Sequence, residues 1–230
     1  MKNYLIVGGS SGIGLHLAKT LALAGNKVQV LSRSWKEAEM PQNITFSSID
    51  ITEEVVQFPE ITEPIDGLIY CPGSINLRPF RALKQADFMN DLQINYLGAV
   101  KTIQKYLPQL QQSTAPSIVL FSTVAVQKGM PFHASIAGAK GAIEGLTKSL
   151  AAEFAPKIRV NAIAPSLTET PLAEKLLNSE TKMASAAERH PLKKIGSVQD
   201  LSEAALYLLN ATWVSGQILA VDGGMSSIGS

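Results

Sequence analysis

Short apolar runs recur along the chain, and most are followed by a longer segment in which apolar side chains have helical spacing. The runs are rich in β-branched and aliphatic residues, which is typical of strands buried on both faces. Glycine or proline commonly stands between one element and the next. The seven strands that this pattern predicts are Tyr4–Val7, Lys27–Leu31, Ile44–Ile49, Gly67–Tyr70, Ser117–Phe121, Arg159–Ile163 and Gln217–Val221.

Two of the intervening segments have a clear apolar face. Such a face lies along one side of a helix and packs it against a neighbouring layer. Because strands and helices alternate, the pattern predicts an α/β fold in which helices cover both sides of a parallel sheet. The residues on the two faces are Ile13, Leu17, Leu21 and Ala24 in the first segment, and Ile143, Leu146, Leu150 and Phe154 in the second.

The loops give no sign of a domain boundary. Proline and glycine punctuate them without forming a long linker, so we expect residues 1–230 to form a single domain. Residues 170–196 fall outside the strand pattern, and Leu172, Leu176 and Leu177 suggest a short amphipathic helix there. This segment is our candidate for a mobile lid over a substrate.

Charge and cysteine content exclude several classes of protein. The chain has 20 Lys and Arg against 19 Asp and Glu and no basic run, so nucleic acid is not an expected partner. Cys71 is the only cysteine, which excludes an intrachain disulfide and a cysteine-rich metal site. No apolar stretch approaches the roughly 20 residues that span a bilayer. We therefore expect a soluble, cytoplasmic protein without a bound metal or a membrane partner.

The first predicted strand runs directly into a glycine-rich turn and then into a helix. Without Cβ atoms the backbone can turn sharply and approach a pyrophosphate, whose charge is favoured by free N–H groups at the positive end of a helix. Strand, spacing and helix together favour a dinucleotide-binding turn over an ordinary glycine-rich one. No Gly-Lys-Ser/Thr follows, which argues against a Walker-type triphosphatase. The turn residues expected to bind a dinucleotide are Gly8, Ser10, Ser11, Gly12, Ile13 and Gly14.

The end of the second predicted strand bears on which dinucleotide is bound. Ser32-Arg33-Ser34 lacks the acidic residue that would accept hydrogen bonds from a ribose 2′-hydroxyl. A guanidinium binds phosphate bidentately, so Arg33 favours a 2′-phosphate and hence NADP(H) over NAD(H). The alternative is that Arg33 is simply a solvated surface residue.

Further motifs follow in an order found in one family. Asp50-Ile51 resembles a pair that contacts adenine, and Tyr70-Cys71-Pro72-Gly73 stands where Asn-Asn-Ala-Gly is usual and retains only the glycine. Asn95 resembles an asparagine that supports a proton-relay water. With Val160–Pro165 and Gly216–Gly224, these motifs make the sequence resemble the short-chain dehydrogenase/reductase family over essentially its whole length.

The resemblance implies a Rossmann-like, doubly wound sheet of seven parallel strands in three α/β/α layers, assembled into a homodimer or homotetramer. It also implies that a helix lysine, Lys140, holds the cofactor ribose. Asn95 and Lys140 could instead be a helix-capping amide and a solvated lysine. The further cofactor-binding residues that the resemblance implies are Asp50, Ile51, Cys71, Pro72, Gly73, Pro165, Ser166, Leu167 and Thr170.

The sequence departs from the family at the active site. The family uses Tyr-x-x-x-Lys, in which the lysine lowers the pKa of a phenol that transfers a proton. Here Lys140 is retained, but Ile136 replaces the tyrosine. Thr123 aligns with the serine that orients a substrate carbonyl, and Ser122 is adjacent. Either hydroxyl could alternatively bond only to the backbone.

Two other side chains could supply the proton. His133 lies at the spacing that related enoyl-thioester reductases use for their tyrosine, and imidazole titrates near neutrality, although a loop histidine is often only packed or exposed. Ser135 is a weaker acid. Cys71 is expected to be a small buried residue with no nucleophilic role.

Three functions are compatible with these residues. The first is an NADP-dependent oxidoreductase with an atypical proton donor, which passes hydride to a carbonyl or activated alkene of a small or acyl-type substrate. The second is a catalytically impaired NADP(H)-binding subunit or redox sensor. The third, a structural paralogue that binds nothing, is disfavoured by the intact glycine turn.

Overall fold

The structure, a computed structural model, describes residues 1–35 and 39–228. In these residues the seven predicted apolar runs all form strands of one parallel sheet, in the order β3-β2-β1-β4-β5-β6-β7. Every boundary lies within two residues of its predicted position, and the largest difference is in β6, which continues to Pro165. The strands are β1 Asn3–Val7, β2 Lys27–Ser32, β3 Ile44–Ser48, β4 Gly67–Tyr70, β5 Ser117–Phe121, β6 Arg159–Pro165 and β7 Ile218–Val221.

The strand order reverses direction next to β1. This strand pairs with β2 on one side and with β4 on the other, so the chain builds the sheet outward in two directions from it. In open parallel sheets, ligands bind in the crevice that such a reversal leaves at the carboxyl ends of the strands. The glycine turn follows β1 and therefore lies at this crevice.

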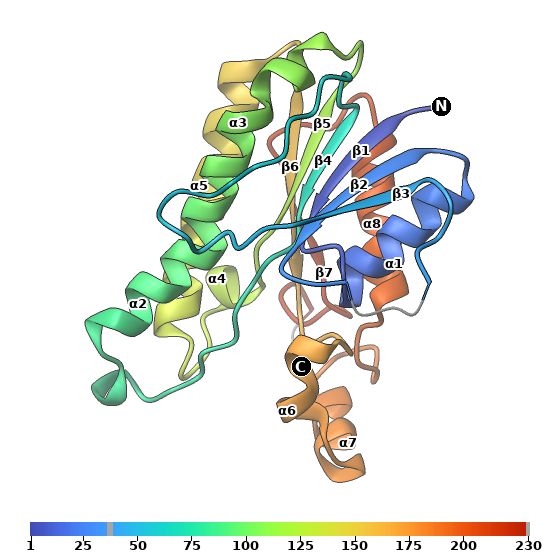
Figure 1. The fold of residues 1–230 in the computed structure, drawn as a ribbon. Helices are drawn as coiled ribbons and strands as arrows, with labels where there is room; N and C mark the ends of the chain where they lie inside the picture. The colour runs from blue at the N-terminus through green and yellow to red at the C-terminus, as the bar shows by residue number, and fades with distance from the viewer. Residues whose placement is uncertain (36–38, 229–230) are drawn as a thin grey trace.

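Helices cover both faces of the sheet, as predicted (Figure 1). On one face lie α1 (Gly12–Leu23) and α8 (Val198–Asn210), and on the other lie α3 (Gly98–Gln112) and α5 (Ala134–Phe154). The shorter elements are the 3-10 turns η1 (Phe80–Ala82) and η3 (Pro171–Ala173), the π-helical turn η2 (Gln93–Leu97), and the helices α2 (Gln85–Leu92), α4 (Ala125–Lys128), α6 (Glu174–Leu177) and α7 (Glu180–Glu188).

Alternate residues of the strands supply two separate cores. In β1, Leu5 packs with the α3 and α5 side, whereas Ile6 packs with the α1 and α8 side. The predicted face of α5 packs as expected around the buried Ile143. On α1, Leu17 and Leu21 are buried as predicted. The prediction for Ala24 was wrong, because α1 ends before it and leaves it exposed.

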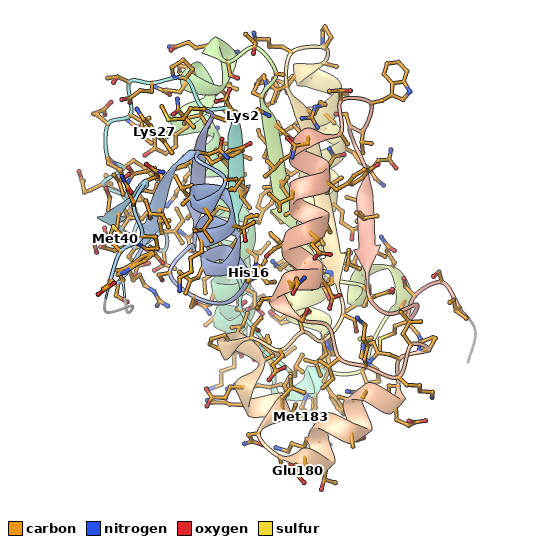
Figure 2. All side chains as sticks on the ribbon, turned by 90° about the vertical axis from the view of Figure 1, so that its right-hand side faces the viewer. Lys2, His16, Lys27, Met40, Glu180 and Met183 are labelled. Atoms are coloured by element: carbon orange, nitrogen blue, oxygen red, sulfur yellow. The ribbon has the colours of Figure 1, made fainter. Side chains whose placement is uncertain are left out.

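The predicted lid segment projects beyond the carboxyl ends of the strands (Figure 1), and Glu180 and Met183 of α7 lie at the opposite end of the molecule from Lys2 (Figure 2). A backbone bridge between Thr168 and Gly196 closes its base. The segment holds two α-helices where one was predicted, because the Ser179 hydroxyl accepts a hydrogen bond from the Lys182 amide and starts α7.

Candidate active site

One cavity of about 820 Å³ runs along the carboxyl ends of the strands, from the glycine turn to the base of the lid segment. Every residue that the sequence indicated for cofactor binding, from Gly8 to Thr170, lines this cavity. Among the catalytic candidates, Ser122, Thr123, His133 and Lys140 also line it. Residues drawn from all parts of the sequence pattern therefore meet in a single pocket.

The glycine turn is shaped by close backbone contacts. Gly8 and Gly12 have φ angles of 77° and 54°, in the left-handed region that favours glycine. A Cβ atom at Gly14 would collide with the carbonyl oxygen of Gly8, so the start of α1 packs directly against the end of β1. This contact fixes the direction in which the first turn of α1 points into the cavity.

Within the described residues, no side chain at the N-cap satisfies the N–H groups in the first turn of α1. Ser11 occupies the N-cap position, but its side chain makes no capping hydrogen bond, and the first turn contains no acidic residue. In contrast, the Ser197 hydroxyl at the start of α8 accepts a hydrogen bond from the Asp200 amide at 3.1 Å. The uncapped N–H groups of α1 and the helix dipole suit an anion. Together with the glycine contacts, this cradle fits a dinucleotide diphosphate.

Arg33 lies at the outer end of the cavity. Its side chain is exposed, while the neighbouring Ser32 hydroxyl lies 2.8 Å from the Ser10 hydroxyl of the glycine turn. On the facing loop, hydrogen bonds from the Thr52 hydroxyl and amide, with a smaller contribution from the Arg33 charge, lower the pKa of the Asp50 carboxyl. A cationic edge and an ionised carboxylate therefore stand side by side at this end.

Lys140 is a buried residue, so the alternative of a solvated helix lysine was wrong. Its side chain is 8% exposed, and its Nζ donates a 2.8 Å hydrogen bond to the carbonyl oxygen of Phe121. Burial lowers the pKa of Lys140 to about 8, although the charges of Cys71 and Asp91 act in the opposite direction. Burial also raises the pKa of the Cys71 thiol to about 12, which disfavours a nucleophilic thiolate.

Asn95 lies behind the cavity wall in a buried polar cluster that the sequence did not reveal. Its Nδ2 donates to the Ser74 hydroxyl and to the Asp91 carbonyl oxygen, each at 2.8 Å, so it does serve the helix backbone. Ser74 lines the cavity and donates a 2.6 Å hydrogen bond to the fully buried Asp91 carboxylate. A Cβ atom at Gly73 would stand 3.5 Å from Asn95 Oδ1 and 3.6 Å from Lys140 Nζ.

This polar cluster retains unused hydrogen-bonding capacity. Asn95 Oδ1 and Asp91 Oδ2 are buried and make no hydrogen bond within the described residues. Asn95 also belongs to the π-helical turn η2, a local distortion that is frequent at functional sites. Buried polar atoms without partners are costly unless a water or ligand satisfies them. The narrow space beside Gly73 therefore suits a polar group of a ligand or a bridging water.

The remaining sequence candidates differ in the burial of their side chains and in the hydrogen bonds that these side chains make. Ile136, at the tyrosine position, is 5% exposed and lines the cavity. Ser122 donates a 2.7 Å hydrogen bond to Glu144. His133 Nδ1 lies 2.7 Å from the Pro131 carbonyl oxygen. Ser135 is buried and does not line the cavity, so the structure gives no support to it as a proton donor.

Of the two candidate hydroxyls that line the cavity, those of Ser122 and Thr123, the Thr123 hydroxyl is the less committed. Its Oγ1 accepts a 3.3 Å hydrogen bond from the Ala125 amide, and its nearest acceptor, the Pro165 carbonyl oxygen, is 3.5 Å away. The amide therefore fixes the oxygen, while the hydroxyl hydrogen makes only a long bond. Such a hydroxyl can turn towards a substrate oxygen.

The wall beyond Pro165 contains a second arrangement that sequence reasoning missed. Ser166 lines the cavity, and its Oγ lies 2.8 Å from Nε2 of His190. Nδ1 of the same imidazole lies 2.8 Å from the Ala186 carbonyl oxygen. No motif links residues so far apart, although His190 is the only histidine of the predicted lid segment and could have been noted for that reason.

Two other kinds of site are not found in the described part of the chain. Residues 1–35 and 39–228 contain no group of three or more His, Cys, Asp or Glu side chains placed to hold a metal ion. Within the same ranges, no helix combines the length and the apolar character needed to cross a membrane.

The chain is similar to known proteins along nearly its whole length. A family model described as enoyl-(acyl carrier protein) reductase matches residues 7–226. Carbonyl reductase family member 4 from Xenopus laevis is 30% identical over 231 residues, which cover 96% of each protein. The fold and the order of the motifs therefore agree with a sequence relationship, not with structural likeness alone.

Solved structures give the same result for the fold. ElxO with NADP bound is 28% identical and superposes with a TM-score of 0.87, covering 99% of each chain. The 3-ketoacyl-(acyl-carrier-protein) reductase from Brucella melitensis complexed with NADH is 25% identical and superposes with a TM-score of 0.84, covering 98% of each chain. One of these neighbours holds NADP and the other NADH.

Proposed function

The chain belongs to the short-chain dehydrogenase/reductase family of oxidoreductases, and on that premise we propose that it transfers hydride between NADP(H) and a carbonyl or activated alkene. The observation that carries the proposal is the continuity of one cavity from the glycine turn to Thr123 and Lys140. When bound, a reduced nicotinamide supplies the hydride. The protein would orient the reactants, exclude water and supply a proton.

The glycine end of the cavity would hold the diphosphate. Gly8, Gly12 and Gly14 bring the backbone close, and the uncapped start of α1 offers N–H donors to the phosphate oxygens. Asp50 and Ile51 line the part of the cavity next to β3, where the adenine would lie. No step of the reaction takes place here, so this end determines affinity.

Arg33 supports NADP(H) as the preferred form. Arg33 is exposed and lines the cavity together with Ser32 and Ser34, and its guanidinium can bind a 2′-phosphate with two parallel hydrogen bonds. An ionised Asp50 nearby would help to hold the guanidinium in place. NAD(H) lacks that phosphate and would gain nothing from this cationic edge.

The other end of the cavity would hold the reacting groups. Lys140 would donate to the ribose hydroxyls, and Cys71, Pro72 and Gly73 would line the ribose. Thr123 can donate to a substrate carbonyl oxygen, which polarises the carbon that accepts the hydride. Residues Pro165 to Thr170 would cover the nicotinamide. The segment 170–196 would form the lid that shapes the substrate pocket.

Ile136 supports a second candidate function. An isoleucine at the tyrosine position cannot donate or accept a proton, so the chain could bind NADP(H) without turning it over. It would then act as a cofactor-binding subunit or a sensor of redox state. This alternative predicts tight binding of the nucleotide and no oxidation with any substrate.

The two functions are separated by following NADPH absorbance with a panel of small ketones, aldehydes and enoyl and 3-oxoacyl thioesters. The oxidoreductase proposal predicts NADPH consumption that depends on both enzyme and substrate, with the reduced product identified by mass spectrometry. Nucleotide binding without consumption across the panel would contradict it and favour the binding subunit. Absence of binding would contradict both.

A further inference from the structure

Resting on the proposed oxidoreductase function, we propose that Ser166 and His190 form the proton relay that replaces the missing tyrosine hydroxyl. Ser166 would exchange a proton directly with the substrate oxygen. His190 would exchange a proton with Ser166 from behind the cavity wall. The relay was not predicted, because Ser166 was expected only to bind cofactor and His190 was assigned no role.

The hydrogen bonds around His190 define its tautomer. The Ala186 carbonyl oxygen, 2.8 Å from Nδ1, can only accept, so Nδ1 carries the hydrogen of a neutral ring. Nε2 is then an acceptor and receives the Ser166 hydroxyl at 2.8 Å. A hydroxyl, an imidazole base and a third group that orients the base are the parts of an activated hydroxyl in enzymes.

The burial of the two residues gives the relay a direction. His190 is 1% exposed, whereas Ser166 lines the cavity. The ring packs against Gly223, whose φ angle is 62° and whose absent Cβ atom would stand 3.5 Å from the imidazole. Of the two residues, Ser166 lines the cavity and His190 does not. A proton from His190 would therefore reach a substrate through the Ser166 oxygen.

Ser166 lines the same cavity as the other reacting groups. Ser166 follows Pro165, whose carbonyl oxygen is 3.5 Å from the Thr123 hydroxyl. Ile136 lines the same cavity and supplies no proton. The Ser166 hydroxyl also has a second acceptor, the sulfur of Met225 at 3.2 Å, so it can rotate away from the imidazole. Such a rotation would let the hydroxyl receive a proton from the imidazole and donate one to the substrate oxygen.

The charged groups near the imidazole come from two segments. Burial acts to raise the pKa of the Asp222 carboxyl, but hydrogen bonds from Ser226 and Gly224 and the nearby charge of His190 hold it below its usual value. Asp222 therefore remains ionised. On the segment of His190 itself, Arg189 is exposed and Lys193 pairs with Glu188 at 2.7 Å.

With this relay, the hydride and the protons are accounted for in both directions of the reaction. In reduction, hydride from NADPH forms a C–H bond at the carbonyl carbon while the C=O π pair moves to oxygen. That oxygen takes the Ser166 proton, Ser166 takes the proton of the imidazolium Nε2, and NADP⁺ and a neutral imidazole remain. In oxidation, the same protons move in reverse and the imidazole becomes charged. Reduction therefore uses the protonated ring of His190, and oxidation uses the neutral ring.

The kinetic test compares Ser166→Ala with the wild type in single turnovers at saturating NADPH, using a substrate identified by the panel. Loss of the relay should slow reduction by at least about 100-fold, within the usual contribution of acid catalysis. Ser202→Ala, which removes a buried hydroxyl from α8 away from the cavity, is the matched control and should react at the wild-type rate. Ser166→Ala reacting as fast as Ser202→Ala would overturn the relay.

Two further readouts separate catalysis from a structural role. The solvent deuterium isotope effect on reduction should disappear in His190→Gln. Adding Ile136→Tyr to Ser166→Ala should restore part of the rate, since a phenol then stands one helical turn before Lys140, whereas adding Ile136→Phe should not. A rate loss in His133→Gln, with none in Ser166→Ala, would overturn the relay and assign the proton to His133, which lines the cavity.

A measurement without cofactor tests the same pair. The chain has three histidines, so the imidazole nitrogens can be assigned in ¹⁵N spectra from single variants. The relay predicts that His190 carries its hydrogen on Nδ1 and that Ser166→Ala shifts its Nε2 resonance. A hydrogen on Nε2, or an unshifted resonance, would overturn it. No turnover by the wild type would overturn the function and the relay together, whereas turnover undiminished in Ser166→Ala would overturn the relay alone.

Discussion

The ammonium of Lys140 donates a 2.8 Å hydrogen bond to the carbonyl oxygen of Phe121, the last residue of β5. The bond holds a buried cation at the point where the sheet meets the cavity. Burial lowers the pKa of Lys140 from 10.5 to about 8, so the folded protein releases this proton more readily than the unfolded chain does. The free energy of unfolding must therefore respond to pH through this residue.

The lowered pKa of Lys140 determines the direction of the stability change and the pH range in which it occurs. Above about pH 8 the unfolded chain holds more protons at Lys140 than the folded protein, so stability rises with pH by up to about 1.4 kcal/mol per unit. Above pH 9 the unfolded Cys71 thiol ionises and acts in the opposite direction. Urea unfolding between pH 8 and pH 9 should show the rise in the wild type but not in Lys140→Met. If the free energy of unfolding changed with pH in the same way in both proteins, the assignment of a buried cation to Lys140 would be contradicted.

Asp91 should control the ionisation of Lys140. Its buried carboxylate is one of two charges that raise the lysine pKa against burial. Asp91→Asn keeps an oxygen that can accept from Ser74 but removes the charge, so Lys140 should titrate below about pH 8. The measurement is the pH dependence of the Lys140 side-chain resonances. Asp87→Asn, on the same helix but outside the buried cluster, is the control, and an equal shift in both variants would argue against the assignment.

Gly14→Ala should remove nucleotide binding. The new Cβ atom would collide with the Gly8 carbonyl oxygen, so the turn must open and its N–H groups must leave their positions. We expect at least a tenfold weaker affinity for NADPH and a less stable fold. Gly138→Ala is the matched control, because its Cβ atom meets nothing within 4 Å and alanine is the better helix former by about 1 kcal/mol. Unchanged affinity in Gly14→Ala would be incompatible with the proposed diphosphate site.

Arg33→Ala should equalise the affinities for NADPH and NADH. The guanidinium is exposed, so its removal should leave stability within about 0.5 kcal/mol of the wild type while it weakens NADPH binding tenfold or more. Affinity for NADH should barely change, which makes the second nucleotide an internal control. Fluorescence titration gives both constants. Equal affinities in the wild type would show that Arg33 does not select the cofactor.

The strands were predictable because each is an apolar run set off by glycine or proline, and burial on both faces leaves few polar residues in it. The ends of helices were less predictable. Ala24 continues the apolar spacing of α1, but the helix ends at the residue before it. The lid segment was predicted as one helix, because the serine cap at Ser179 is a local signal that spacing alone does not reveal.

The candidate site was predictable only where a motif marks it. The glycine turn and Lys140 belong to such motifs, but Asp91 lies in a segment of mixed polarity, and its burial depends on packing between α2 and α5. The position of Asp91 one helical turn before Asn95 was the sequence feature from which its place in the buried cluster could have been inferred. Ser166 and His190 meet only because the lid segment returns to the sheet at the Thr168–Gly196 bridge. That closure is a long-range contact that no local pattern contains.

The most direct test of the account is a calorimetric titration of the wild-type protein with NADPH. We predict a saturable heat of binding with a dissociation constant on the order of micromolar, which is the lower end of the usual range of Michaelis constants. Dinucleotide binding at the glycine turn would be contradicted if NADPH, NADP⁺, NADH and NAD⁺ all gave no heat at millimolar concentration.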